Sequence, residues 1–341
     1  MLDILKELCA LRGVSGDEGE VRDYIIGRVR EHADKVETDV LGNVIVYKKG
    51  ARASKKKILL CAHMDEVGVI ITSISNDGYL RFDIAGSVDS RVVAGKAVTI
   101  GKQGVFGVIG CKPAQLYKAK ERERTLEVEN LYIDIGAKNR DEAARLVSLG
   151  DTGAFEAVTR EFGDGFIKAR AIDDRFGCAV LVKLIESDLP IDCTFAFTVQ
   201  EEVGLRGAYT VAHRVAPEIA LIIEGTTAAD FPSVADSKKV CRVGGGAVIP
   251  FMDGGTIYDK EIYGTLTSLA ESNKVPWQTK NVIAGGTDAA AIQRSRAGVK
   301  TAGIAAPVRN LHSQSCVAKV SDLDAVLKLA RLFLDQIGEN N

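Results

Sequence analysis

Short, continuous hydrophobic runs alternate with amphipathic stretches over residues 165–341 of the chain. The runs 192–199, 218–223 and 299–304 have the length of strands that are buried on both faces of a sheet, and 57–62 repeats this pattern near the N-terminus. Apolar residues recur at helical spacing in a second set of segments: 176–186, 209–214, 259–272, 288–295 and 321–337. Strands that alternate with helices predict a largely parallel central sheet in a three-layer α/β/α domain.

The pattern changes between residues 67 and 164, where the hydrophobic runs are short and rich in β-branched residues. Turn signals such as Asn76-Asp77-Gly78 separate these runs, which are 67–71, 79–84, 97–100, 105–109 and 131–135. Such spacing predicts a small all-β unit, either a barrel or a sandwich, with one helix over 140–149. We therefore expect a discontinuous α/β domain (1–66 and 165–341) that carries an inserted β-rich domain (67–164).

Composition mainly narrows the possible partners and the cellular compartment of the protein. The 341 residues include 44 Lys and Arg against 46 Asp and Glu, a formal net charge of −2, which gives no electrostatic reason to expect nucleic acid or a membrane surface as partner. The charge run Lys118–Arg124 has alternating signs and is typical of a solvated turn. Seven cysteines without CxxC spacing, and an N-terminus without signal-peptide character, favour a cytoplasmic protein.

Histidines and carboxylates stand at the ends of the predicted strands. The candidates are His63 and Asp65 after 57–62, Glu201 and Glu202 after 192–199, Glu224 after 218–223, His312 after 299–304, and Asp173 in the turn before 176–186. The carboxyl ends of parallel strands meet at one edge of a sheet, so these side chains are expected to lie together. Two histidines and three carboxylates can hold two divalent ions if one aspartate bridges them, with a further carboxylate as general base.

Taken alone, each of these motifs also has a purely structural explanation, such as a helix cap for Asp173-Asp174. As an ordered set they resemble the M42 family of dinuclear metallo-aminopeptidases, some of whose members are labelled endoglucanases. The matching motifs run through nearly the whole chain: Ala62-His-Met-Asp-Glu-Val-Gly68, Ala171-Ile-Asp-Asp-Arg175, Val199-Gln-Glu-Glu-Val-Gly204, Gly285-Gly-Thr-Asp-Ala289 and Arg309-Asn-Leu-His-Ser313.

The resemblance implies a role for each residue. His63 and Glu224 would bind one divalent ion, Glu202 and His312 would bind the other, and Asp173 would bridge the two. Asp65 would orient His63, and Glu201 would be the general base that acts on a metal-bridging hydroxide. Zinc or cobalt is the expected metal, with manganese as a further candidate. Many members of the family have Asp where this chain has Glu224, which bears on metal geometry rather than on the reaction.

The resemblance further implies peptide substrates with a free N-terminus. It also implies homo-oligomers built through the inserted domain, up to a hollow tetrahedral dodecamer. Three alternatives stay open at this point. The chain could be a related metal-dependent peptidase or deacylase that acts on a blocked or non-peptide amide, a non-catalytic binding scaffold, or a glycoside hydrolase. The last is disfavoured because adjacent carboxylates such as Glu201 and Glu202 do not flank a sugar bond.

Overall fold

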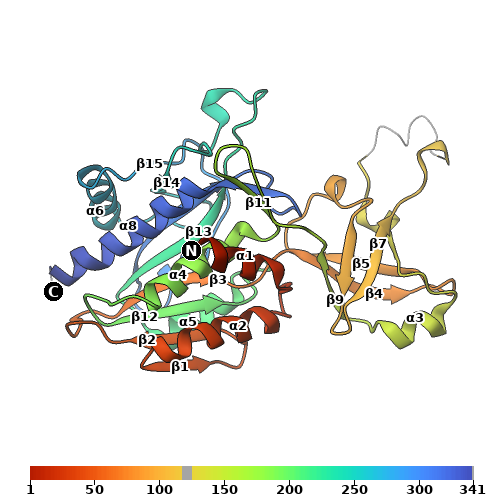
Figure 1. Ribbon diagram of the computed structural model, residues 1–341, viewed down its shortest axis with the longest axis horizontal. Coiled ribbons are helices and arrows are strands. Elements are labelled where there is room, and N and C mark those ends of the chain that lie inside the picture. Colours follow the sequence, from red (N-terminus) through yellow and green to blue (C-terminus); the bar gives the residue numbers. More distant parts are fainter. Residues whose placement is uncertain (117–124, 340–341) are drawn as a thin grey trace.

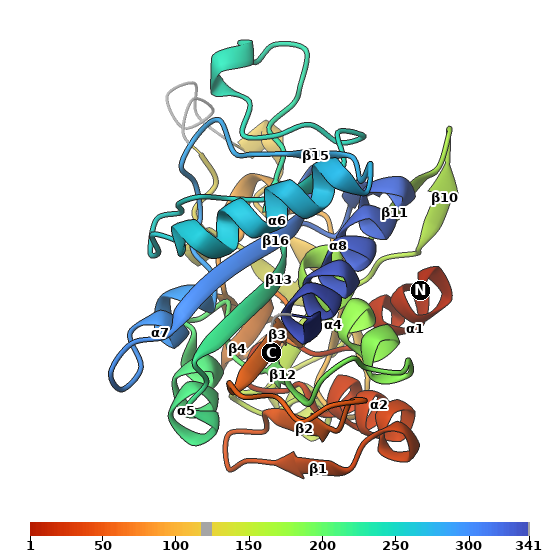
Figure 2. The same ribbon diagram turned by 90° about the vertical axis from the view of Figure 1, so that its left-hand side faces the viewer.

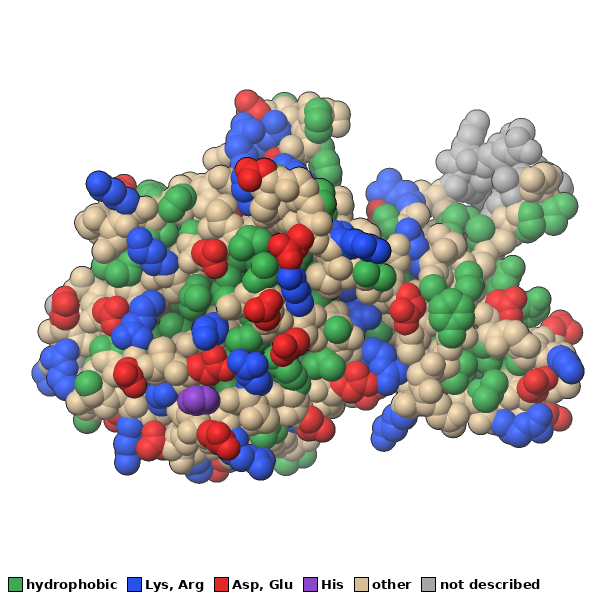
Figure 3. Space-filling view, viewed as in Figure 1, with side chains coloured by type: hydrophobic (Ala, Val, Ile, Leu, Met, Phe, Trp, Pro, Cys, Tyr) green, Lys and Arg blue, Asp and Glu red, His purple; other side chains and the backbone are tan. Residues whose placement is uncertain are grey.

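The computed structural model describes residues 1–116 and 125–339, so the charge run Lys118–Arg124 lies outside the described residues. An α/β body carries a smaller β barrel that projects from one side (Figure 1), and the space-filling view shows the barrel standing clear of the body (Figure 3). No helix in the described part of the chain has both the length and the apolar character needed to cross a membrane.

The body is built on one mixed sheet with the strand order β1-β2-β12-β3-β13-β16-β14-β15. The four central strands, β12, β3, β13 and β16, run parallel to one another. On one side β2 pairs antiparallel with β12, and on the other β14 pairs antiparallel with β16. The bounds in sheet order are Lys35–Thr38, Val44–Lys48, Cys193–Thr198, Ile58–His63, Ile219–Thr227, Lys300–Val308, Ala247–Val248 and Trp277–Gln278.

Helices cover both faces of this sheet because the central strands are hydrophobic on both sides. In β3, Leu60 and Ala62 pack into one core, whereas Leu59 and Cys61 pack into a second core on the opposite face. The first core is closed by α1 (Leu2–Ala10), α2 (Gly19–Val29), α4 (Ile172–Ile185), α6 (Lys260–Ser272) and α8 (Val320–Glu339). The second is closed by α5 (Arg206–Val215) and α7 (Ala289–Gln293), on the other side in Figure 2. The predicted α/β/α architecture is confirmed.

The inserted unit is a closed antiparallel barrel with the strand order β4-β5-β8-β7-β6-β9, rather than a sandwich. Its strands, in chain order, are Gly68–Ile74, Leu80–Ala85, Ala97–Ile100, Val105–Gly110, Tyr132–Asp134 and Thr152–Phe155. Helix α3 (Arg140–Leu146) contributes Ala143 to a separate barrel core, so the barrel buries its own apolar side chains. The short 3-10 helices of the described chain are Arg30–His32, Ser90–Val92, Ala114–Leu116, Val128–Asn130 and Asp236–Lys238.

A second, three-stranded sheet joins the return from the barrel to the C-terminal part of the chain. Its strands are β10 (Arg160–Phe162), β11 (Phe166–Ala169) and β17 (Cys316–Lys319), and β11 pairs antiparallel with both neighbours. Helix α4 begins shortly after β11, and the turn that carries His312 comes shortly before β17. This sheet therefore brings the Asp173 turn next to the His312 turn, although 139 positions separate the two residues in the sequence.

Candidate metal centre

The carboxyl edge of the parallel strands carries the predicted ligands. His63 is the last residue of β3, Glu201 and Glu202 follow β12 within four residues, and His312 lies in the turn after β16. Glu224 differs from the sequence prediction, which placed it after a strand ending at residue 223. Strand β13 continues to Thr227 because it keeps pairing with β16 as far as Val308, so Glu224 projects from the strand itself.

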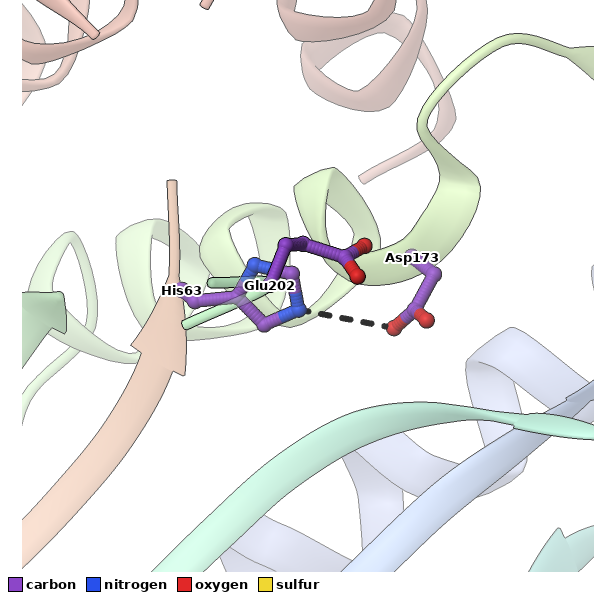
Figure 4. A group of neighbouring side chains, drawn as sticks. All are labelled: His63, Asp173 and Glu202. Atoms are coloured by element: carbon purple, nitrogen blue, oxygen red, sulfur yellow. Dashed lines mark ion pairs between the residues drawn. The ribbon is translucent and has the colours of Figure 1, made fainter. Parts of the chain in front are cut away.

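Two histidine–carboxylate groups share Asp173. In the first group, His63 Nε2 lies 3.6 Å from Glu224 Oε2 and 3.7 Å from Asp173 Oδ1. In the second, His312 Nε2 lies 3.3 Å from Glu202 Oε2 and 3.8 Å from Asp173 Oδ2. We call His63 with Glu224 the strand half, and Glu202 with His312 the loop half. Figure 4 shows His63, Asp173 and Glu202 converging from three elements.

Both imidazoles point the same nitrogen at the carboxylates. His63 Nδ1 lies 3.1 Å from the backbone oxygen of Asp65, and His312 Nδ1 lies 2.8 Å from the backbone oxygen of Ser87, which follows the barrel strand β5. A carbonyl oxygen can only accept, so each Nδ1 donates its proton, which leaves each Nε2 facing the carboxylates as the nitrogen that could bind a metal ion. This tautomer is the one that metal-binding histidines adopt.

The buried Asp65 ties the two halves together. Its carboxylate accepts hydrogen bonds from the backbone N–H of Glu201 (2.9 Å) and Glu202 (3.1 Å) and from the hydroxyl of Ser15 (2.6 Å). Its side chain is fully buried, and its Oδ1 lies 3.4 Å from His63 Nδ1. Asp65 therefore holds the turn that presents Glu201 and Glu202, in addition to lying against the His63 ring.

The second aspartate of the Asp173-Asp174 pair has a different environment. The carboxylate of Asp174 accepts from the backbone N–H of Gly177 (2.9 Å) and of His63 (3.2 Å), whereas that of Asp173 accepts from Gly225 N–H (3.1 Å). Three ligand atoms of His63, Asp174 and Glu224 lie within 4.8 Å of one another, as do those of His63, Asp173 and Glu202. Of the two aspartates, Asp173 is the one whose oxygens lie within 3.8 Å of both histidines, so it is the candidate for a position between two metal ions.

The carboxylates are crowded and buried, and their pKa values reflect this. Burial raises the pKa of Glu202 to about 8, with Asp173 adding repulsion. Burial also raises the pKa of Glu201 well above its ordinary range, and Asp288 and Glu202 push in the same direction. The pKa of Glu224 rises for the same reason, and its Oε1 atom is buried without a hydrogen-bond partner.

These observations fit divalent metal ions. Burial lowers the pKa of the His63 imidazole, but the carboxylates of Glu224 and Asp173 outweigh burial and raise that pKa well above its ordinary value. The spaces of 3.3–3.8 Å between the histidines and the carboxylates therefore favour a positive charge, which a divalent ion would supply. The donor set of imidazole nitrogens and carboxylate oxygens suits zinc, cobalt or manganese, and the orphaned Glu224 oxygen would gain a partner.

One cavity of about 320 Å³ contains six of the seven predicted site residues, and Asp65 lies beneath it. The rest of the lining includes Thr226, Lys280, the stretch 284–287 and Leu311. The other two histidines of the chain, His32 and His213, are exposed. The sequence analysis did not identify Lys280, because it lies in a loop after a two-residue edge strand and no motif marks it.

Sequence comparison decides the family. Residues 42–329 match the family model described as M42 glutamyl aminopeptidase. The chain belongs to the M42 peptidase family. It is accordingly a peptidase, a metal-dependent aminopeptidase, and the resemblance seen in the sequence motifs is confirmed.

Several M42 relatives span almost the whole chain. A putative aminopeptidase of Acetivibrio thermocellus is 39% identical, with 96% of this chain and 97% of the relative covered. A lysyl aminopeptidase of Pyrococcus furiosus is 30% identical (98% and 97% covered), and a glutamyl aminopeptidase of Lactococcus lactis is also 30% identical (94% and 92% covered).

Solved structures of M42-like enzymes share the fold. An aminopeptidase from the archaeon Desulfurococcus kamchatkensis superposes with a TM-score of 0.93 at 35% identity, covering 99% of this chain and 96% of the other. The TET1 peptidase of Pyrococcus horikoshii, described as assembling into a tetrahedron or a large octahedral shell, gives 0.87 at 33% identity with 98% of each chain covered. The α/β body with an inserted barrel is thus common to these proteins.

Proposed function

We propose that this M42 peptidase removes N-terminal residues from peptides with the help of two divalent ions, and that Glu201 is its general base. The observation that carries the proposal is the pair of histidine–carboxylate groups that share Asp173 beside Glu201 in one cavity. His63 and Glu224 would hold one ion, Glu202 and His312 the other, and Asp173 both.

Divalent ions at this site would acidify a bound water and polarise the scissile carbonyl. The role of Glu201 follows from its position and environment: its side chain lines the cavity, and burial raises its pKa so that it readily takes up a proton. Glu201 accepts the proton of the attacking water on a carboxylate oxygen and later delivers it to the nitrogen of the departing peptide. The same acidic lining favours a substrate with a free, positively charged amino terminus.

The Glu201→Gln variant tests this assignment. It removes the base while leaving the proposed ligands and the Asp65 hydrogen bonds to the backbone in place. We expect metal content to stay at the wild-type level and kcat to fall by about 10²–10⁴-fold, the usual contribution of general acid–base catalysis. Glu31→Gln, at an exposed glutamate far from the cavity, is the matched control and should change neither quantity.

N-acetylation of the substrate distinguishes an aminopeptidase from the main alternative, a metal-dependent deacylase. Unblocked and N-acetylated versions of the same peptides are compared with zinc, cobalt or manganese, and with chelator. Release of the first residue from unblocked peptides alone, abolished by chelator, supports the aminopeptidase. Cleavage of the acetylated peptides would assign the site to deacylation, and wild-type turnover by Glu201→Gln would exclude Glu201 as the base.

We also propose that the protein is a homo-oligomer, up to a tetrahedral dodecamer. The TET1 relative of Pyrococcus horikoshii has been crystallised as a dodecamer. On this chain the barrel and the adjoining β10 expose large apolar side chains, among them Phe106, Leu149 and Phe162. Exposed apolar groups of this size are typical of interfaces between subunits. A mass near that of one 36.5 kDa chain in sedimentation at micromolar concentration would contradict the assembly.

A further inference from the structure

Lys280 is a buried cation in the wall of the metal cavity. It lies in the loop after β15, its exposed fraction is 7%, and it lines the same cavity as His63, Glu201 and His312. Its ammonium group donates to one backbone oxygen, that of Ala284, at 3.2 Å. No carboxylate in the described ranges, 1–116 and 125–339, forms an ion pair with it within 4.0 Å.

The nearby acidic groups are already engaged elsewhere. Asp253 accepts from the backbone N–H of Gly255 and Thr256 and from the hydroxyl of Tyr258, at 2.7–2.8 Å. Glu224 and Asp173 are assigned to the metal ions. An ammonium group has three donors, so the buried Lys280 retains donors beyond the hydrogen bond to Ala284. Burial lowers its pKa, as expected for a cation without a close counter-ion.

From this geometry we infer that Lys280 is a specificity-determining residue that makes the enzyme prefer peptides with an acidic N-terminal residue, Glu or Asp. The inference rests on the proposed function, since it concerns the substrate of the same site. A side-chain carboxylate would pair with the unused Lys280 donors, and the hydroxyls of Thr226 and Thr227 stand in the same wall. A basic N-terminal residue would instead meet a buried like charge.

The matching family model is described as glutamyl aminopeptidase, but the individual relatives do not agree on the first residue of the substrate. The lysyl aminopeptidase of Pyrococcus furiosus and the glutamyl aminopeptidase of Lactococcus lactis are equally similar to this chain, at 30% identity. The charged side chains of the cavity do distinguish a peptide that begins with Glu from one that begins with Lys. Its carboxylates all belong to the proposed metal and proton-transfer set, which leaves Lys280 as the charged group of the described lining that is available to a substrate side chain.

The experiment measures kcat/KM for peptides that differ only in the first residue: Glu, Asp, Gln, Leu and Lys. The wild type should cleave the Glu peptide about 10–100-fold better than its uncharged analogue, the Gln peptide, the usual effect of one charge-assisted hydrogen bond. Lys280→Met should remove this advantage while changing kcat/KM for the Leu peptide by less than about threefold. Lys260→Met, an exposed lysine at the start of α6, is the control for the charge change.

Binding provides a readout that does not depend on turnover. In calorimetry, free glutamate should bind the wild type more tightly than free glutamine, and Lys280→Met should abolish the difference. An active wild type that prefers Leu or Lys peptides, or a Lys280→Met variant that loses activity equally on every substrate, overturns the inference. A wild type without metal-dependent cleavage of any unblocked peptide would instead overturn the proposed function, so the two failures are distinguishable.

Discussion

The strand half and the loop half use the same two ligand types but are held in different ways. His63 and Glu224 stand on β3 and β13, adjacent parallel strands of the central sheet, and the His63 side chain is 1% exposed. Glu202 and His312 stand in loops after β12 and β16, and the His312 side chain is 27% exposed. Sheet hydrogen bonds fix the first pair, whereas a few turn contacts fix the second.

This contrast indicates a division of labour within one centre. In the proposed two-ion centre, the ligand pair on packed strands keeps its geometry at little cost and should retain its ion. A pair on loops can adjust, and its ion is closer to solvent and to an arriving peptide. The chain just after the barrel strand β5 reaches the loop half, where the backbone oxygen of Ser87 accepts a hydrogen bond from His312. Movement of the barrel against the body would therefore displace the loop half directly.

The largest expected effect separates the two halves by substitution. His63→Ala and His312→Ala should each reduce kcat by about 10³-fold or more, since each ion contributes several kcal/mol to the transition state. The variants should differ in the ion that remains. His312→Ala should keep one slowly exchanging ion per chain, whereas the ion left in His63→Ala should be lost rapidly to chelator.

Elemental analysis during dialysis against chelator measures this difference. In the wild type the same experiment should give two phases of metal release, with an intermediate that holds one ion per chain. Equal release rates from the two variants would show that the strand and loop positions hold metal equally. This result would contradict the expected difference between the two halves.

A smaller effect is expected at Asp65, which serves both halves. Asp65→Asn places an amide N–H₂ group where donors from Glu201, Glu202 and Ser15 now converge, so at least one hydrogen bond becomes a repulsive contact. We expect metal affinity to fall by about 10–100-fold, the usual cost of disturbing a group that orients ligands. Competition with a chromogenic chelator measures the affinity. Ser15→Ala, which removes a single donor, is the control and should have a clearly smaller effect.

The sequence predicted the strand half better than its surroundings. The uninterrupted apolar run 57–62 marked β3 and placed His63 at its end, because strands covered on both faces leave a strong local pattern. Glu224 was expected just after the strand that ends at residue 223. It lies within β13, because the pairing of this strand with β16 continues through polar residues. Strands β14 and β15 have two residues each. Their pairing within the sheet defines them, because two residues are too few to show an alternation of hydrophobic and polar positions.

Side-chain partners were the least predictable feature. The pattern Asp173-Asp174 marked a candidate site but could not tell which carboxylate binds metal, because non-helical backbone angles at both residues turn the two side chains apart. Lys280 enters the cavity through a loop whose path depends on β15 and on contacts with residues 240 and 284. Such residues become visible only once the fold has brought distant segments together.

The smallest effect concerns Glu18, a buried carboxylate that binds the backbone just before Glu201 and Glu202. It accepts from the backbone N–H of Gly16 (2.7 Å) and of Gln200 (3.1 Å), where Gln200 has a φ of 55° and leads into Glu201. Burial raises the pKa of Glu18 to about 7. A raised pKa means that the folded state binds the proton more tightly, so this contribution to stability is complete below about pH 4.5 and is lost as the pH rises through 7.

Glu18→Gln keeps an oxygen acceptor without the charge. In metal-free protein, its free energy of unfolding relative to the wild type should therefore increase between about pH 4.5 and 8, by up to about 3 kcal/mol. Chemical denaturation across this pH range, with exposed Glu31→Gln as the control, measures the difference. If the two proteins lose stability in parallel as the pH rises, Glu18 is ionised throughout, and the turn before Glu201 and Glu202 is held by a charged carboxylate.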